Sequence, residues 1–557
     1  MKIIGRITAL ENKPTTIDEF YFWTDPRRIL DPFDVVVVDH LNGSKTYGVV
    51  EEINHITDTP GYMGAFISND FGDVNTKAPT NRIGMNYIKA SVVKNTKAIY
   101  NPVQDGRHVR LASADEISEA LGLANVQNAL PCGYIQMYSK NKDEQVRLPV
   151  DFNSKFLIGP EGAHLNISGI SGLAAKTSYA MFLLKGMQYR MSHSSTKKTF
   201  NDESVAFVVI NVKGRDLLTL DKRPDPGQFT DEDAERYKEL GIEPTPFEKV
   251  KYFFPYEQEG FSNTYAPKEY VDDLIKTEKG FRYKYTFDQD LESLDLLFAN
   301  IEDITGTMES ACNYIQSKQG RFASIRTWDA LESEINEHGK ANSGRGDKEI
   351  TVQSWRKFKR IISKSLKNSM FGNRVVEKQN EVRLSSALEN IKANEMFVVD
   401  IAKLDENLQS FVFGDVIRTI YDLKLGQLTD KEEDIPNRIV IFIDELNKYA
   451  GSDLPKNSPI LRQIIDISER GRSLGIVLFT AEQFKSAIHE RVKGNCSTHA
   501  YGRTNAIEVS KKDYSYIPKV YKNMMVRLTQ GEYIVQNPVF TSPLHIRFPR
   551  PIYYQEK

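Results

Sequence analysis

The sequence predicts an α/β protein in which a small N-terminal β-barrel precedes a parallel-sheet core, with a helical bundle inserted into that core. Three observations lead to this fold class. Residues 1–110 hold only short strand-like runs, and from residue 151 strand-like runs alternate with helical ones. Between residues 257 and 394 the alternation stops, and charged, helix-forming sequence replaces it. Alternating strands and helices indicate βαβ units on a parallel sheet.

Residues 1–110 are predicted to form the barrel. The stretch FDVVVVDHLNGSKTYGVVEEI holds two strand-like runs, and Asn42-Gly43 between them supplies the positive φ angles of a tight hairpin turn. Further short apolar runs, such as KASVVKNTKAIY, suit a small barrel. No residue pattern here indicates catalysis, so we interpret this part as a structural or docking module. A linker is expected over residues 111–150.

Residues 151–256 and 395–530 are predicted to be the two parts of the α/β core. Near-continuous runs of β-branched and aromatic residues are typical of parallel strands that are buried on both faces. The runs in question are AHLNISG, VAFVVINVKG, VKYFFPY, EMFVVDIAKL, RIVIFIDEL and LGIVLFTAEQ.

Residues 257–394 are predicted to be the helical insertion, and residues 531–557, with several prolines and no helical period, an extended tail on a surface. Within the insertion, residues 340–378 contain eleven Lys or Arg residues. Apolar residues recur there at helical spacing, namely Trp355, Phe358, Ile362, Leu366 and Met370. An amphipathic helix with a solvated basic face is the favoured interpretation, and contact with nucleic-acid phosphates is the alternative.

The composition narrows the class of protein. The 557 residues carry a formal net charge of −2, so binding to nucleic acid or acidic membranes would need a local basic patch. Cys132, Cys312 and Cys496 have no metal-ligand spacing and are typical of free thiols in a reducing compartment. The N-terminus lacks a signal-peptide pattern, and no run of about 18 apolar residues would span a membrane. We therefore expect a cytoplasmic protein that does not bind membranes.

A candidate phosphate-binding loop lies in FLIGPEGAHLNISGISGLAAKTSYAMFLLKG, residues 156–186. The stretch reads as a strand, a turn of small residues, a lysine and hydroxyl pair, and an apolar helix. In such loops glycines let backbone N–H groups point at a phosphate, the lysine adds charge, and the next hydroxyl binds Mg²⁺. The helix N-terminus also favours anions. The nucleotide-binding residues are predicted to be Gly169, Gly172, Ala174, Ala175, Lys176, Thr177 and Ser178.

This loop departs from the standard spacing. The standard pattern has glycine directly before the lysine and six residues before it, and Ala175 and Ile170 occupy those positions here. The glycines instead lie seven and four residues before Lys176, as if one residue had been inserted. A Gly-rich turn beside an ordinary exposed lysine is therefore the alternative.

Further polar residues follow two other predicted strands. RIVIFIDELNKY ends in Asp444-Glu445, a costly place for carboxylates unless they have a role. We expect Asp444 to hold Mg²⁺ and Glu445 to polarise the attacking water as a general base. Gln483 ends GIVLFTAEQ and is suited to sensing a γ-phosphate. Arg470 and Arg472 lie before that strand. Arginine is suited to stabilising phosphate charge, including across a subunit boundary. The alternative is that these two arginines lie on a solvated helix end and have no role in catalysis.

The order of these features resembles the HerA family of hexameric ATPases, relatives of the FtsK translocases within the RecA-like P-loop class. The resemblance covers nearly the whole chain and is strongest at residues 158–218 and 396–505. It implies a RecA-like core, an N-terminal barrel, ATP and Mg²⁺ as ligands, a homo-hexamer, and a C-terminal tail that braces a neighbouring subunit. Lys176 and Thr177 match the family's phosphate loop, Asp444 and Glu445 its second acidic motif, Gln483 its sensor, and Arg472 its trans-acting arginine.

The resemblance leaves two functions open. In the first, a ring hydrolyses ATP to translocate or remodel duplex DNA as a helicase-like motor. Lys213 and Arg215 would then face a central channel and contact DNA. For Arg215, a local ion pair with Asp216 is the alternative. In the second, the ring is a scaffold that activates a partner. The loop is similar to that of a bacterial branch found beside effector enzymes in anti-phage operons. The partner would then be a nuclease or a sirtuin-like NAD-degrading enzyme docked on the barrel.

Overall fold

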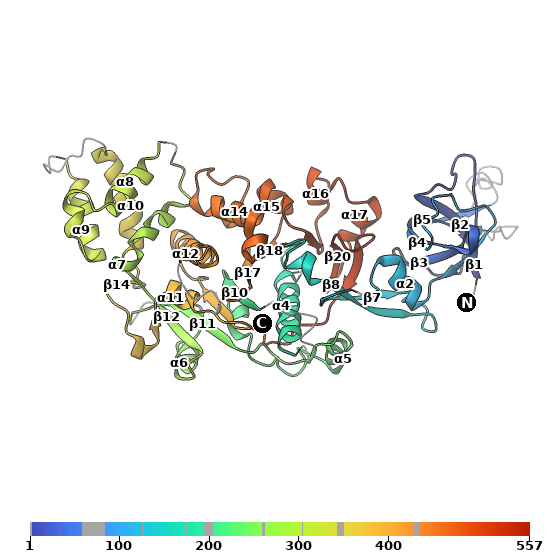
Figure 1. Ribbon diagram of the computed structural model, residues 1–557, viewed down its shortest axis with the longest axis horizontal. Helices are drawn as coiled ribbons and strands as arrows, with labels where there is room; N and C mark the ends of the chain where they lie inside the picture. Colours follow the sequence, from blue (N-terminus) through green and yellow to red (C-terminus); the bar gives the residue numbers. More distant parts are fainter. Residues whose placement is uncertain are drawn as a thin grey trace, which may run out of the picture.

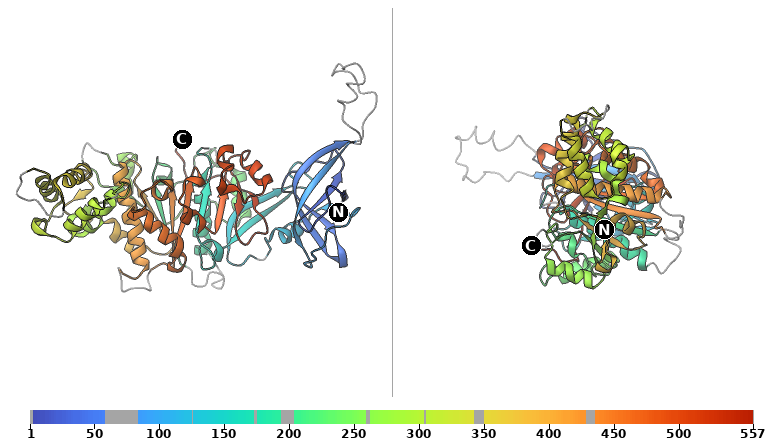
Figure 2. Two further views of the ribbon diagram at one scale, coloured as in Figure 1. Left: turned by 90° about the horizontal axis from the view of Figure 1, so that it is seen from above. Right: turned by 90° about the vertical axis from the view of Figure 1, so that its left-hand side faces the viewer.

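The computed structural model describes residues 3–57, 84–124, 126–172, 175–193, 204–258, 262–303, 305–341, 350–427 and 435–556. The molecule is elongated, with a β-barrel at one end, a helical bundle at the other and an α/β core between them (Figure 1). The left view of Figure 2, seen from above, shows the same order of parts. Within the described ranges, no helix has the length and apolar character that crossing a membrane requires.

The N-terminal part is a closed antiparallel barrel. Its strands are β1 (Ile3–Ile7), β2 (Glu19–Thr24), β3 (Val35–Asp39), β4 (Lys45–Thr57), β5 (Gly84–Asn95) and β6 (His108–Leu111), in the order β1-β2-β5-β4-β3-β6. The turn between β3 and β4 places Asn42 at φ 56° and Gly43 at φ 65°, as the sequence predicted. Alternate apolar side chains of β2 and β3, including Phe20, Phe22 and Val36, fill the interior.

The core is a long mixed sheet. Its order is β15-β12-β11-β16-β10-β17-β18-β9-β19-β20-β21-β7-β8, parallel from β15 to β19 and antiparallel from there to β8. The bounds are β7 Ala129–Met137, β8 Val146–Asn153, β9 Leu165–Ser168, β10 Val205–Asn211, β11 Val250–Pro255, β12 Gly280–Tyr283, β15 Glu381–Val382, β16 Met396–Asp400, β17 Arg438–Asp444, β18 Ile476–Glu482, β19 Thr498–Tyr501, β20 Glu532–Gln536 and β21 Leu544–Arg547. The six predicted core strands are all present, as β9, β10, β11, β16, β17 and β18.

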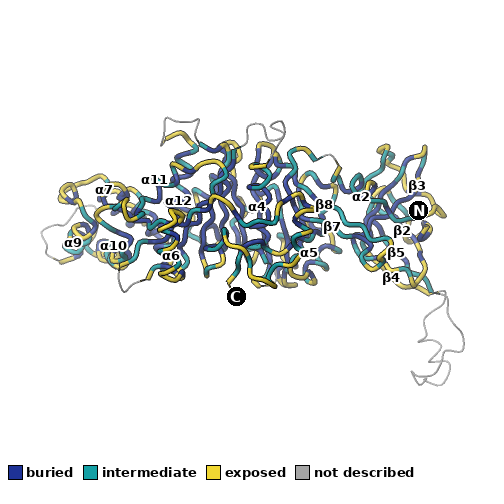
Figure 3. Tube along the Cα trace, turned by 90° about the horizontal axis from the view of Figure 1, so that it is seen from below, coloured by how far each residue is buried: buried dark blue, intermediate teal, exposed yellow. Residues whose placement is uncertain are grey.

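Helices cover both faces of this sheet, which explains the continuous apolar runs. In β10, Val205 and Phe207 pack into one core cluster and Ala206 and Val208 into the other. α4 (Lys176–His193) belongs to the first cluster, and α12 (Glu406–Lys424) and α14 (Pro459–Leu474) belong to the second. Figure 3 shows the central strands buried along their length. The predicted fold class, an α/β RecA-like core with an N-terminal barrel and an inserted bundle, is confirmed.

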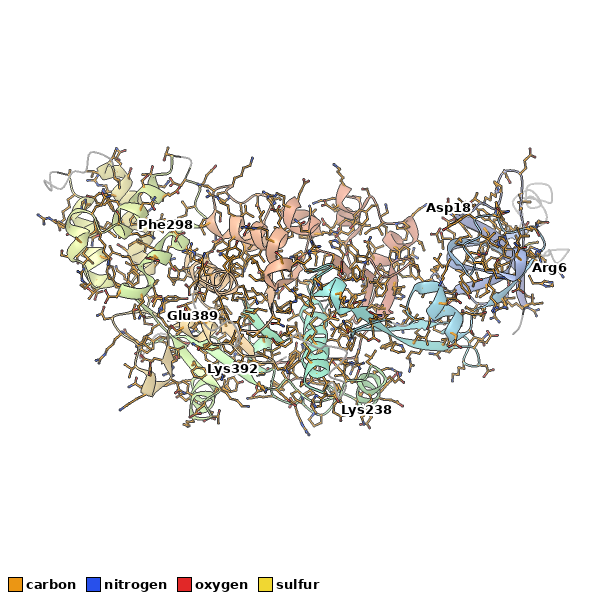
Figure 4. All side chains as sticks on the ribbon, viewed as in Figure 1. Arg6, Asp18, Lys238, Phe298, Glu389 and Lys392 are labelled. Carbon is orange, nitrogen blue, oxygen red and sulfur yellow. The ribbon has the colours of Figure 1, made fainter. Side chains whose placement is uncertain are left out.

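The inserted bundle lies beyond the β15 edge of the sheet. It consists of α7 (Phe287–Asp290), η3 (Leu291–Phe298), α8 (Thr307–Gln316), η4 (Gly320–Ser324), α9 (Trp328–His338) and α10 (Val352–Ser365), followed by α11 (Leu384–Glu389). The five apolar residues predicted to form a helix face around α10 are all buried. Phe298 lies in this bundle, at the opposite end of the molecule from Arg6 and Asp18 of the barrel (Figure 4).

Three predicted segments contain strands that the sequence did not reveal. Residues 111–150, expected to be a linker, hold α2 (Ala114–Leu121), β7 and most of β8, which form the far edge of the sheet. The predicted insertion contributes β12 and β15 to the opposite edge. The predicted tail contributes β20 and β21, and β21 pairs with β7. The apolar runs of these strands are short or interrupted by polar residues, glycine or proline, as in ALPCGYIQM of β7 and VRLPVDFN of β8.

Candidate nucleotide-binding site

The candidate phosphate loop connects β9 to α4 at the carboxyl edge of the parallel strands. β18 lies between β9 and β17 and pairs in parallel with both, with Glu482 opposite Ser168 and Ala481 opposite Asp444. This strand order brings the loop and the predicted acidic pair to one edge, about two strand spacings apart, or roughly 10 Å. Of the predicted loop residues, Ala174 lies outside the described residues.

The loop backbone adopts left-handed conformations where the sequence placed its turns. Gly172 has φ 79°, and an added Cβ there would meet nothing within 4 Å. Ala175, at the position where the standard pattern has glycine, has φ 48°. An alanine in this conformation costs roughly 1–2 kcal/mol. The chain therefore keeps a glycine-like backbone directly before Lys176 although glycine itself is missing.

Lys176 and Thr177 begin α4 and face different partners. The Lys176 ammonium is buried and donates to the Gly169 carbonyl oxygen at 2.9 Å and lies 3.4 Å from the Ser171 hydroxyl. Lys176 is thus folded back over its own loop. The Thr177 hydroxyl donates to Oδ2 of Asp444 at 3.3 Å, across 267 residues of sequence. The predicted hydroxyl and the predicted acidic residue therefore meet.

The acidic pair ends β17 and binds two lysines. Lys213 Nζ lies 3.2 Å from Asp444 Oδ2 and 3.1 Å from Glu445 Oε1, and Lys448 Nζ lies 2.8 Å from Glu445 Oε2. Glu445 has φ 58°, a conformation that non-glycine residues adopt at a cost and that is concentrated at functional sites. Asp444 is buried, whereas Glu445 is half-buried and opens toward solvent.

The site shifts the pKa of several groups. Burial lowers the pKa of Lys176, although the carboxylate of Asp444 opposes that effect. Burial raises the pKa of Glu445, but hydrogen bonds from Lys448 and Lys213 outweigh it and leave the pKa below its ordinary value. Glu445 is therefore charged at neutral pH, as a general base must be before it accepts a proton.

Glu482 is a site residue that the sequence prediction missed. It is the last residue of β18, fully buried, and neither carboxylate oxygen has a hydrogen-bond partner within the described part of the chain. Burial raises its pKa to about 8. The available signal was an acidic residue inside the apolar run IVLFTAE, because such a residue is costly unless it has a function. The prediction chose the next residue, Gln483, which the structure places exposed at the same edge.

The two predicted arginines lie at the opposite end of β18. Arg470 and Arg472 belong to the last turns of α14, which leads into the first residue of β18. Arg470 is held by the carboxylate of Asp466, with Nε 2.7 Å from Oδ1, and by the Tyr421 hydroxyl at 2.8 Å. Arg472 donates to the Glu161 carbonyl oxygen at 3.1 Å. The seven residues of β18 put roughly 20 Å between these arginines and the loop of the same chain.

The two predicted DNA-contact residues lie beside this site. Lys213 bridges the acidic pair, as described above. Arg215 pairs with Glu556 at 2.7 Å, so the Arg215–Asp216 ion pair that the sequence left open is not the one formed. The C-terminal tail thus reaches the candidate site, and Figure 1 shows the C-terminus beside α4.

The donor set suits a magnesium ion. Mg²⁺ prefers hard oxygen ligands and takes few of them from protein, leaving the other positions to water and phosphate. The Thr177 hydroxyl and the Asp444 carboxylate are such ligands, and the Lys213 ammonium already lies against the same carboxylate oxygen. Within the described ranges, no group of three or more His, Cys, Asp or Glu side chains could hold a metal ion by itself.

Comparison with known proteins assigns the chain to no family. No protein-family model matches the chain, and no curated protein matches it. The bacterial conjugative coupling protein TrwBdeltaN70 matches with a TM-score of 0.42 and 13% identity, over 73% of this chain and 90% of the TrwBdeltaN70 chain. VirB4 of Thermoanaerobacter pseudethanolicus matches with a TM-score of 0.42 and 12% identity, over 76% of this chain and 96% of VirB4. The genome packaging NTPase B204 from Sulfolobus turreted icosahedral virus 2 matches with a TM-score of 0.23 and 15% identity, over 30% and 72%.

Proposed function

We propose that this protein is a ring-forming ATPase of the HerA–FtsK type that binds ATP with Mg²⁺, hydrolyses it, and uses the energy to translocate or remodel duplex DNA. The observation on which this proposal depends is the contact between the Thr177 hydroxyl and Asp444 Oδ2 at 3.3 Å. It joins two motifs that the sequence had identified separately, at the edge of the sheet where α/β proteins bind ligands.

Each residue has a chemical role in this proposal. The α4 N-terminus and Lys176 bind the phosphates once Lys176 leaves the Gly169 carbonyl, which needs rotation of its side chain only. Thr177 and Asp444 would hold Mg²⁺, which neutralises charge on the β- and γ-phosphates. Glu445 orients a water molecule and accepts its proton, after Lys213 and Lys448 have turned toward the phosphates or solvent. Gln483, which is exposed directly after β18, would contact the γ-phosphate in this proposal.

The proposal also covers the oligomeric state of the protein and its binding partners. A head-to-tail interface that closes gives a ring, and we propose a homo-hexamer with duplex DNA in its channel. We further propose that an effector enzyme, a nuclease or a sirtuin-like NAD-degrading enzyme, docks on the barrel in an anti-phage role. Several exposed large apolar side chains of the barrel, among them Trp23, Ile29 and Tyr100, support a docking role for that end of the molecule.

A second function is a nucleotide-dependent hexameric scaffold that activates the effector with little motor activity. Two lysines hold the general-base candidate Glu445, and Lys176 covers its own loop, which favours a site that binds nucleotide more readily than it turns it over. The two functions share one fold and one nucleotide site, and they differ in the effect of DNA.

The experiment measures phosphate release by the wild-type protein with and without duplex DNA, and particle mass with and without ATP by mass photometry. A motor should show DNA-stimulated release from a hexamer, and Lys176→Ala should abolish release because the phosphates lose their mobile counter-charge. A hexamer with DNA-independent, slow release would favour the scaffold. Undiminished release by Lys176→Ala would place the ATPase site elsewhere.

A further inference from the structure

We propose that the last residues of the chain form one wall of a cavity that holds the ribose and base of the nucleotide, so that the C-terminal tail gives the site its preference for nucleosides over bare polyphosphate. The inference rests on the proposed nucleotide function. It adds a subsite for the nucleoside to the phosphate subsite already described. It concerns the tail of the same chain as the phosphate loop.

A cavity of about 750 Å³ lies directly beside the phosphate loop. Ala175 and Ser178, on either side of Lys176 and Thr177, line it together with Tyr134 of β7. The tail supplies one wall through residues 548–551, Tyr553, Gln555 and Glu556, and residues 227–236 supply much of the rest. Because Thr177 faces Asp444 and the next residue faces this cavity, a nucleotide whose phosphates lie on the α4 N-terminus has its nucleoside end here.

The charges of the lining suit a nucleoside and not a further phosphate. Four acidic side chains line the cavity, Asp216, Glu232, Asp233 and Glu556, against two arginines, Arg236 and Arg550. Carboxylates repel phosphate but accept hydrogen bonds from ribose hydroxyls and from the amino group of a base. The Asp216 carboxylate makes no ion pair or hydrogen bond with any described residue and is available as such an acceptor. The half-buried Tyr134 ring adds an aromatic side chain to the lining, with the guanidinium groups of Arg147 and Arg236 each 5.7 Å from its centre.

The tail is fixed to the core on both sides of the loop. The Thr219 hydroxyl donates to the Tyr554 carbonyl oxygen at 2.8 Å, and Gln228 Nε2 donates to the Gln555 carbonyl oxygen at 3.0 Å. The Gln555 side chain lies 3.4 Å from the Ser178 hydroxyl in the first turn of α4, and Glu556 pairs with Arg215. These hydrogen bonds and the Arg215–Glu556 ion pair hold the tail in place. They can be removed by mutation without changing Lys176 or Thr177.

The test compares two ligands on the full-length protein, a non-hydrolysable ATP analogue and inorganic tripolyphosphate, each with Mg²⁺, by isothermal titration calorimetry. The first variant ends at Tyr553, which removes the contacts above but keeps the buried Phe548, Ile552 and Tyr553. The second is Asp216→Asn, which keeps the shape of the side chain. The control is Asp18→Asn at the barrel end (Figure 4). Thermal melting shows that each variant is folded.

We expect both test variants to weaken binding of the ATP analogue about tenfold, as the loss of one or two hydrogen bonds implies. Their affinity for tripolyphosphate should stay within about twofold, or rise in Asp216→Asn where a negative charge is lost. Equal weakening for both ligands, or no change for either, would overturn the inference while leaving the nucleotide site intact. A wild-type protein that binds neither ligand would overturn the proposed function itself.

Discussion

The two ends of strand β18 present opposite chemistry. At its carboxyl end, Glu482 is buried and has no hydrogen-bond partner among the residues that the structure describes, and Ala175 and Glu445 nearby hold left-handed backbone conformations. At its amino end, Arg470 and Arg472 are exposed, and each has a partner in its own chain. Backbone strain and a buried carboxyl group are thus concentrated at the end where we propose that nucleotide binds, whereas the arginines at the other end are paired within their own chain.

This difference bears on the proposal that an arginine of one subunit contacts the phosphate bound by its neighbour. At the carboxyl end the lysines Lys176, Lys213 and Lys448 are present, but the arginines lie roughly 20 Å away along the strand. They can act on phosphate only if the amino end of one subunit meets the carboxyl end of the next. Arg472, which gives up only a neutral carbonyl partner, is better suited to this than Arg470, which would leave the carboxylate of Asp466.

The largest effect is expected from Arg472→Ala, which should reduce turnover about a thousandfold or more, as loss of an arginine finger does. The variant should still bind nucleotide, because its own loop is intact. Mixed with Lys176→Ala subunits, it should regain part of its activity wherever its intact site adjoins a neighbour that keeps Arg472. Phosphate release at several mixing ratios measures this, with mass photometry to show mixed hexamers.

Arg491→Ala is the matched control, because Arg491 is exposed near the same end of β18 and pairs with Glu469 at 2.6 Å. It should keep wild-type turnover. Mixed hexamers that regain no activity at any ratio would exclude Arg472 as a trans-acting residue. If Arg470→Ala loses as much activity as Arg472→Ala, Arg470 shares the role or takes it over.

The second prediction tests the carboxyl end. Glu445→Gln should reduce turnover about 10²- to 10⁴-fold, because the amide cannot accept the proton of the attacking water. Affinity for ATP should be unchanged or higher, since Lys213 and Lys448 lose a negative partner and turn more easily toward phosphate. Single-turnover hydrolysis and equilibrium binding separate the two effects. Glu469→Gln, in an exposed ion pair, is the control, and normal turnover in Glu445→Gln would remove it from the mechanism.

The same contrast explains how far the sequence could predict this molecule. Strands buried on both faces, such as β10 and β17, are visible because they contain unbroken apolar runs, with polar residues only at their ends. The motif residues Lys176, Thr177 and Asp444 are visible because their chemistry depends on local spacing. Strands β7 and β21 were not recognised as neighbours in one sheet, because they pair across more than 400 positions, as in Arg547 opposite Tyr134. Glu482 was missed for a related reason, since its burial is set by β9 and β17.

The third prediction concerns the pH dependence of stability. Burial raises the pKa of Glu482 from 4.5 to about 8, so the native state keeps a proton that the unfolded chain releases. Its contribution to stability is therefore complete below about pH 4.5 and is lost as the pH rises toward 8. The melting temperature of wild type should fall as the pH is raised from 5 to 8, because the native state must give up this proton. Glu482→Gln is permanently neutral, so its melting temperature should fall by a few degrees less over the same pH range. Glu11→Gln on the barrel is the control, and parallel melting curves for Glu482→Gln and wild type would refute this account.

The smallest effect is expected from Ala175→Gly, which tests whether the unusual loop is strained. At φ 48° glycine removes the left-handed penalty of alanine but adds freedom to the unfolded chain, so the net gain in the free energy of unfolding should be about 0–1 kcal/mol. Affinity for ATP should be kept, because the backbone already has the conformation that glycine would give it. The matched change at the amino end of β18 is Gly475→Ala, where φ is 77° and a Cβ would lie 2.1 Å from the Asn437 carbonyl oxygen. That change should be destabilising by several kcal/mol. Denaturant unfolding of the two variants should therefore give opposite signs, and a destabilised Ala175→Gly would mean that the alanine methyl group makes contacts that outweigh its strain.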